Sequence, residues 1–105
     1  MSRFENVTVV KAANVYFDGG VTSRTIEFPD GSTRTLGFML PGNYTFDTGK
    51  AEFVEIQSGE LRWRLCGESE WQDLIAGQSF HVPGNNKFEL QVTKATDYVC
   101  SFLDE

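Results

Sequence analysis

The 105-residue chain has only one histidine, two cysteines and three prolines, and it has no long apolar run. No stretch approaches the roughly 20 consecutive apolar residues of a membrane-spanning helix, so the sequence predicts no membrane partner. The N-terminal stretch lacks the continuous apolar segment of a signal peptide, and the expected location is therefore cytoplasmic. A net charge of −6 argues against a nucleic-acid-binding surface, which needs clustered Lys and Arg.

Metal ligands are also scarce. A metal centre needs three or four suitable ligands, and His81 with the distant cysteines Cys66 and Cys100 does not provide them. The two cysteines could pair, but in a cytosolic protein we expect two small buried apolar residues. The sequence therefore predicts no metal and no organic cofactor, and it contains no Ser-His-Asp type of nucleophile set.

Short segments of alternating apolar and polar residues fill the chain, and Gly, Pro, Asn and Asp separate them every 8–12 residues or so. This pattern is typical of an all-β sandwich or barrel. The expected strands are 7–10, 14–17, 21–28, 33–40, 43–47, 52–57, 60–66, 71–74, 79–82, 88–93 and 97–103. The sequence predicts that the chain turns back at Ser58-Gly59. We expect one domain over 1–105, with 1–13 as an N-terminal strand or arm.

The alternation of period two assigns side chains to faces of the strands. If Phe80 faces the interior, then His81 faces outward, which favours a surface role over an acid–base or ligand role. If Trp63 lies in the core, then Arg62 and Arg64 lie outside. Sheets this apolar must cover their edges, and we expect a homodimer.

Two signatures centred on turns resemble the motifs of the cupin barrel, a jelly-roll or double-stranded β-helix. Six residues separate Glu52 from Gly59, and five separate Gly77 from Pro83. In cupins the first motif supplies two histidines and a glutamate, and the second supplies one histidine. Here only Glu52 remains, and Phe88 stands at the place of the last histidine. The resemblance implies an all-β, cupin-type jelly-roll barrel that has lost its metal ligands.

A more specific resemblance covers about residues 14–103. Its residues are Tyr16-Phe17 with Gly19, Gly37 and Met39, Gly42 to Phe46 with Thr48, Ser58-Gly59 with Leu61, Trp71-Gln72, Gly77, Phe80, Val82 to Gly84, Phe88 with Leu90 to Val92, and Tyr98 with Cys100. In their order and spacing they resemble the small pyrimidine/purine nucleoside phosphorylase family. The resemblance implies a pentosyltransferase that uses inorganic phosphate as co-substrate. Its partners would be nucleosides and phosphate, and its products a free base and ribose or deoxyribose 1-phosphate.

This reaction gives the side chains three tasks. Phosphate is bound by Arg, Lys, backbone N–H groups and hydroxyls, and Arg24 and Arg34, which flank a hairpin turn, are candidates. Glu52, at the cupin ligand position, is the catalytic candidate, because a carboxylate can orient ribose or stabilise an oxocarbenium-like transition state. The base needs an aromatic face. The candidates for it, which could equally be core residues, are Tyr44, Phe46, Phe80, Phe88 and Tyr98.

Two alternatives remain open at this point. A non-catalytic cupin that binds a small polar ligand would also lack the histidines. A metal-dependent oxygenase or isomerase of the same fold is opposed by the number of available ligands.

Overall fold

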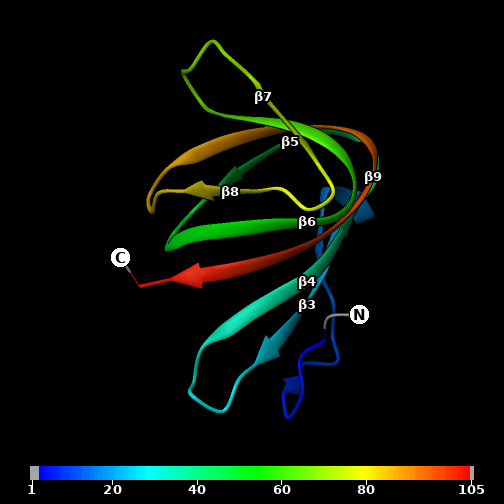
Figure 1. Cartoon of the computed structure of the whole chain (residues 1–105), viewed down its shortest axis with the longest axis vertical. Helices are drawn as coiled ribbons and strands as arrows, with labels where there is room; N and C mark the ends of the chain where they lie inside the picture. The colour runs from blue at the N-terminus through cyan, green and yellow to red at the C-terminus, as the bar shows by residue number, and fades with distance from the viewer. Residues whose placement is uncertain (1–2, 105) are drawn as a thin grey trace.

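The computed structural model describes residues 3–104, and this part of the chain forms nine β-strands (Figure 1). Met1, Ser2 and Glu105, which belong to the domain expected over 1–105, lie outside the described residues. The strands are β1 Thr8–Val9, β2 Asn14–Tyr16, β3 Val21–Glu27, β4 Thr33–Met39, β5 Gly42–Asp47, β6 Ala51–Leu65, β7 Gln72–Ile75, β8 Ser79–Val82 and β9 Lys87–Leu103. A short 3-10 turn, η1 Phe17–Gly19, follows β2. No helix in the described part of the chain is long and apolar enough to cross a membrane.

Two long strands, β6 and β9, bend and connect two antiparallel sheets (Figure 1). The first half of β6 pairs with β8 and its second half with β7, while both halves pair with β9. In turn, β9 pairs with β5 along its first half and with β4 along its second half. The strands β3, β4, β9, β6 and β8 thus form one sheet, and β5, β9, β6 and β7 form the other. The predicted all-β jelly-roll barrel is confirmed.

The turn predicted at Ser58-Gly59 is wrong, because this dipeptide is a bend inside one 15-residue strand. The register of β6 against β9 shifts three times between Ile56 and Leu61. Gly59 has a φ of 102°, and a Cβ at this position would lie 2.5 Å from the carbonyl oxygen of Ala95. Only glycine fits both the backbone angle and the close approach, so the strand bulges and passes from one sheet to the other without leaving its partner. The expected strands 88–93 and 97–103 are joined in the same way as β9.

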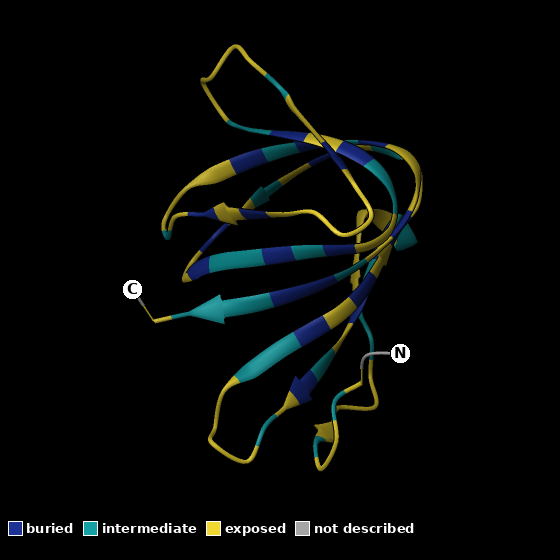
Figure 2. Cartoon of the chain, viewed as in Figure 1, coloured by how far each residue is buried: buried dark blue, intermediate teal, exposed yellow. Residues whose placement is uncertain are grey.

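Buried and exposed residues alternate along most strands (Figure 2). Phe80 and Val82 are buried on either side of the exposed His81, as the alternation predicts. Trp63 is likewise buried beside the exposed Arg62. The expectation for the cysteines is half right: Cys100 is buried in the core, but Cys66 is exposed beyond the end of β6. The N-terminal arm packs on its own chain, because β1 pairs with β3.

Candidate functional site

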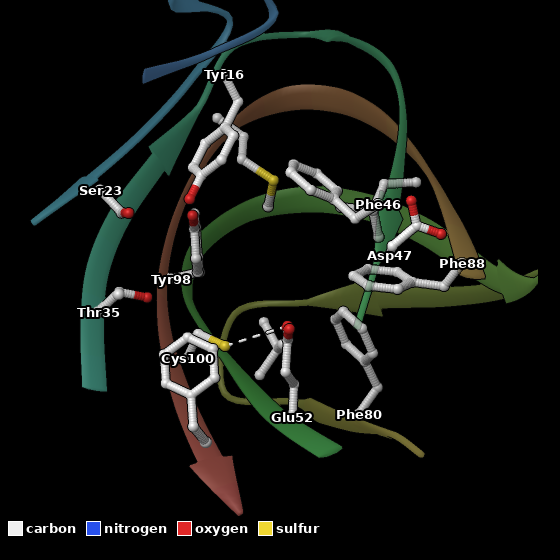
Figure 3. A pocket seen from close by; sticks show the side chains of 14 residues that line it. Tyr16, Ser23, Thr35, Phe46, Asp47, Glu52, Phe80, Phe88, Tyr98 and Cys100 are labelled. Atoms are coloured by element: carbon white, nitrogen blue, oxygen red, sulfur yellow. Dashed lines mark hydrogen bonds between the residues drawn. The ribbon is translucent and has the colours of Figure 1, made fainter. Parts of the chain in front are cut away.

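A cavity of about 160 Å³ lies inside the barrel, between the two sheets (Figure 3). Its lining consists of Tyr16, Ser23, Thr35, Met39, Phe46, Asp47, Glu52, Val54, Phe80, Phe88, Leu90, Tyr98, Cys100 and Phe102. Two carboxylates, four hydroxyls and one thiol are the ionisable or polar groups of this set. Within residues 3–104, no lysine, arginine or histidine belongs to the lining.

One side of the cavity carries four hydroxyl groups, and we call Tyr16, Ser23, Thr35 and Tyr98 the hydroxyl wall (Figure 3). Strand register explains its assembly, because Gly37 of β4 lies directly between Ser23 of β3 and Tyr98 of β9. Gly37 has no side chain, so the Tyr98 ring lies over it, beside Ser23. Thr35 lies one inward position further along β4, opposite Cys100 of β9.

The opposite side carries three phenylalanine rings, and we call Phe46, Phe80 and Phe88 the aromatic wall (Figure 3). Phe46 of β5 and Phe88 of β9 are register partners, and their rings stack with centroids 5.8 Å apart. Phe80 of β8 meets Phe88 edge to face at 6.2 Å. Tyr16 closes the upper end, with its ring 5.7 Å from that of Phe46. A flat apolar surface therefore faces a row of hydroxyls.

Glu52 lies between the two walls, and its carboxylate points into the cavity (Figure 3). The Cys100 thiol donates a hydrogen bond to Glu52 Oε1 at 3.4 Å. Burial raises the pKa of Glu52, and this hydrogen bond partly opposes the shift. Burial and the neighbouring Glu52 raise the pKa of the Cys100 thiol, which keeps the thiol protonated and a donor. Glu52 is the more buried of the two carboxylates that line the cavity, since Asp47 is exposed.

The structure brings five of the eight predicted site residues together. These are Glu52, Phe46, Phe80, Phe88 and Tyr98. The cavity lining also contains five residues that were not among the predicted site residues: Tyr16, Ser23, Thr35, Asp47 and Cys100. The alternation of side chains in β3 and β4 could have indicated some of these residues, because the chain neighbours of Arg24 and Arg34 must face the opposite side of the sheet.

Arg24 and Arg34, which were predicted to bind phosphate, do not line the cavity. Both point to the outer face of the sheet, because Ser23 and Thr35, their chain neighbours, point inward. Arg24 is exposed, and Arg34 lies in a separate groove on the outer face. The Arg34 guanidinium stacks on Phe4 and Phe28, 5.2 Å from each ring centre, so it fixes the N-terminal arm instead.

Tyr44, another predicted substrate contact, is a buried structural residue and does not line the cavity. Its hydroxyl donates to the carbonyl oxygen of Leu40 at 2.7 Å and lies 3.3 Å from that of Gly20. A Cβ on Gly20 or Gly42 would lie 2.9 Å from this hydroxyl, so two glycines make room for it. The hydroxyl group of Tyr44 is therefore bonded to the backbone.

We expect the substitution Tyr44→Phe to lower the free energy of unfolding by about 1 kcal/mol, the usual net contribution of one intramolecular hydrogen bond. Substrate affinity should stay unchanged, because the lost hydroxyl faces backbone and not the cavity. Urea unfolding with a parallel measurement of KM checks this. A raised KM with unchanged stability would return Tyr44 to the site.

The cavity does not fit the metal of other cupins. Phe88 fills the place of one histidine, and no three His, Cys, Asp or Glu side chains converge within residues 3–104. Glu52 with the protonated Cys100 thiol leaves two donors, where a metal needs at least three protein ligands. No step of the chemistry below therefore involves a metal.

Fold comparisons define the class of protein. An RmlC-like cupin from Shewanella frigidimarina superimposes with a TM-score of 0.69 at 17% identity, over 96% of this chain and 86% of that one. An ethanolamine utilization protein from Salmonella typhimurium gives a TM-score of 0.70 at 14% identity, over 92% and 94% of the two chains. Identities this low show the fold alone. The barrel has the cupin fold.

Closer comparisons identify the family. A profile described as pyrimidine/purine nucleoside phosphorylase matches residues 11–102. A relative of that name from Hydrogenovibrio crunogenus is 57% identical over 99% of this chain and its own entire length. Another from Geobacter sulfurreducens is 56% identical over 98% and 99% of the two chains. A crystal structure from Acinetobacter sp. ADP1, described as a protein of unknown function, has a TM-score of 0.92 at 44% identity, over 96% and 98% of the chains. The chain belongs to the pyrimidine/purine nucleoside phosphorylase family, as its sequence motifs predict.

Proposed function

We propose that the chain is a nucleoside phosphorylase that cleaves the N-glycosidic bond of purine and pyrimidine nucleosides with inorganic phosphate. The observation that carries the proposal is the position of Glu52, which points into a cavity with an aromatic wall on one side and a hydroxyl wall on the other (Figure 3). A nucleoside likewise joins an aromatic part, its flat base, to a polar part, its polyhydroxyl sugar. The family membership supports the same chemistry.

Glu52 acts on the ribose. In the transition state the C1′–N bond breaks, its electron pair leaves with the base, and positive charge develops on the sugar ring. An ionised Glu52 in a partly buried cavity stabilises this charge more strongly than it would in water. A phosphate oxygen bonds to C1′ as the base leaves, and the proton of the hydrogen phosphate passes to the departing base nitrogen, which gives pentose 1-phosphate and the free base.

The aromatic wall accounts for acceptance of both purines and pyrimidines. Phe46, Phe80 and Phe88 offer stacking surface, which every base can use, and no hydrogen-bonding groups that would select one base edge. Because the cavity volume of about 160 Å³ lies below the roughly 300–1,000 Å³ of typical ligand pockets, the base extends towards the exposed Asp47.

The proposal includes independence from metal ions. Dialysis against a chelator should leave the rate of base release unchanged, because positioning and electrostatics of the side chains supply the catalysis. Loss of activity in chelator, with recovery on addition of a divalent metal, would favour a metal-dependent cupin instead.

We also propose that the protein is a homodimer that uses the outer face of β3 and β4. Leu36 and Phe38 are 41% and 45% exposed there, next to Arg34, Glu55 and Asp97. A face with apolar side chains and charges of both signs suits a two-fold contact, in which a surface meets its own copy. Light scattering of the purified protein should give the mass of two chains. The cytoplasmic location expected from the sequence stays a prediction.

A further inference from the structure

Phosphate is the reactant for which the cavity has no obvious binding group. The two arginines expected to bind it lie outside the barrel. Lys50 is exposed and forms an ion pair with Asp104, with Nζ and Oδ1 2.8 Å apart. Arg64 lies over the Trp71 ring and pairs with Glu89, away from the cavity lining. An anion inside the barrel must therefore be bound by uncharged donors.

A hydrogen bond to Ser23 leaves the hydroxyl hydrogen of Ser23 available to the cavity. The Asn14 amide Nδ2 donates to Ser23 Oγ at 3.2 Å. This bond occupies a lone pair of Ser23, so Ser23 can donate its hydroxyl hydrogen to a ligand in the cavity that it lines.

Two residues of the wall are buried, which strengthens the hydrogen bonds that they can donate. Ser23 and Thr35 are 5% and 9% exposed, yet both line the cavity, whereas Tyr16 at the upper end is 44% exposed. Burial also raises the pKa of Tyr98, so its phenol keeps its proton and remains a donor at neutral pH. A hydrogen bond between a neutral donor and a charged acceptor is stronger than one between two neutral groups, and a buried site adds to this difference.

We propose that Ser23, Thr35, Tyr98 and Tyr16 form an uncharged subsite for phosphate, an inference that rests on the proposed function. Ser23, Thr35 and Tyr98 lie on the far side of Glu52 from the aromatic wall (Figure 3), so phosphate bound to them would lie opposite the base. A phosphate oxygen therefore reaches C1′ from the side opposite the departing base. The electron pair of the C1′–N bond leaves on the base as the new O–C1′ bond forms, so the configuration at C1′ inverts.

Titration of the purified protein with inorganic phosphate, followed by calorimetry, tests the subsite without any nucleoside. We expect Thr35→Val and Tyr98→Phe each to weaken phosphate binding by about tenfold or more, the usual effect of losing one hydrogen bond to a charged group. Thr35→Ser keeps the hydroxyl and should bind as the wild type does. Arg24→Ala and Arg34→Ala are matched controls with unchanged affinity. Binding should also depend little on salt, in contrast to a site built from exposed cations.

The opposite pattern, with weaker binding in the arginine variants and unchanged binding in Thr35→Val, overturns the subsite. So does the absence of phosphate binding by the folded wild type. A circular dichroism spectrum and melting temperature for each variant separate a lost donor from a lost fold. Phosphate binding that depends on Thr35, without base release from any nucleoside, would keep the subsite and remove the proposed function. Phosphate-dependent base release with an unchanged phosphate KM in Thr35→Val would keep the proposed function and remove the subsite.

Discussion

Replacing Glu52 by glutamine is expected to lower kcat/KM for nucleoside phosphorolysis by at least about a hundredfold, the usual loss on removing one electrostatic catalytic group. Glutamine has the same shape but no charge, so it cannot stabilise positive charge on the ribose. It can still accept the hydrogen bond from Cys100 that the wild type makes. The fold should therefore remain intact, and initial rates with inosine and uridine measure the loss.

Two pH dependences separate this catalytic role from a structural one. Burial raises the pKa of Glu52, so the wild-type rate should fall on acidification at a higher pH than for an ordinary glutamate, and Glu52→Gln should lack this acid limb. Because the folded state holds the proton more tightly than the unfolded state, Glu52 destabilises the fold as the pH rises through its raised pKa. Glu52→Gln should thus melt at a higher temperature than wild type at pH 8 and not at pH 4.

Glu55→Gln is the matched control for this substitution. Glu55 lies on the same strand but in the groove of the outer face. The rate and the acid limb of the Glu55→Gln variant should therefore equal those of the wild type. A Glu52→Gln variant with near wild-type rates would show that the carboxylate is not the catalytic group.

Gly37→Ala is expected to damage both the fold and the activity. A Cβ on Gly37 would lie 2.2 Å from Cζ of Tyr98 and 2.4 Å from its hydroxyl oxygen. The Tyr98 ring must therefore move from its place beside Ser23, which displaces the hydroxyl wall. We expect the free energy of unfolding to drop by about 1–3 kcal/mol, as for overpacked cores. Thermal unfolding and phosphate KM measure the two effects.

Gly49→Ala is the control, since Gly49 has no atom within 4 Å of the added methyl group and no positive φ. The double variant Gly37→Ala/Tyr98→Leu adds a second test. The smaller side chain should relieve the clash and restore part of the stability, while the phosphate KM stays raised because the phenol is absent. Recovery of both properties would mean that Tyr98 contributes packing and no binding.

The fold could be predicted from the sequence because its signals are local. Strand alternation places Phe80 inside and His81 outside, and the turn residues fall between the strands. The bend at Gly59 was misread as a turn, because a glycine with positive φ occurs in both. Only the pairing of both halves of β6 with β9 distinguishes the two, and this pairing joins residues far apart in the chain.

The lining of the cavity was predicted in part. The cupin motifs fix the positions of Glu52 and Phe88, and both residues line the cavity. The arginines were chosen for their charge, although the period of β3 and β4 places Ser23 and Thr35 on the inner face instead. The Ser23–Gly37–Tyr98 row depends on the register of three strands, which no local sequence pattern contains.

The most direct test of the account is an incubation of the pure protein with inosine, adenosine, uridine and cytidine, with and without phosphate, followed by chromatography of free base and pentose phosphate. The account predicts that base appears only with phosphate, and that one pentose 1-phosphate of inverted configuration forms for each base. Release of base without phosphate, or no release from any of the four nucleosides, would contradict it.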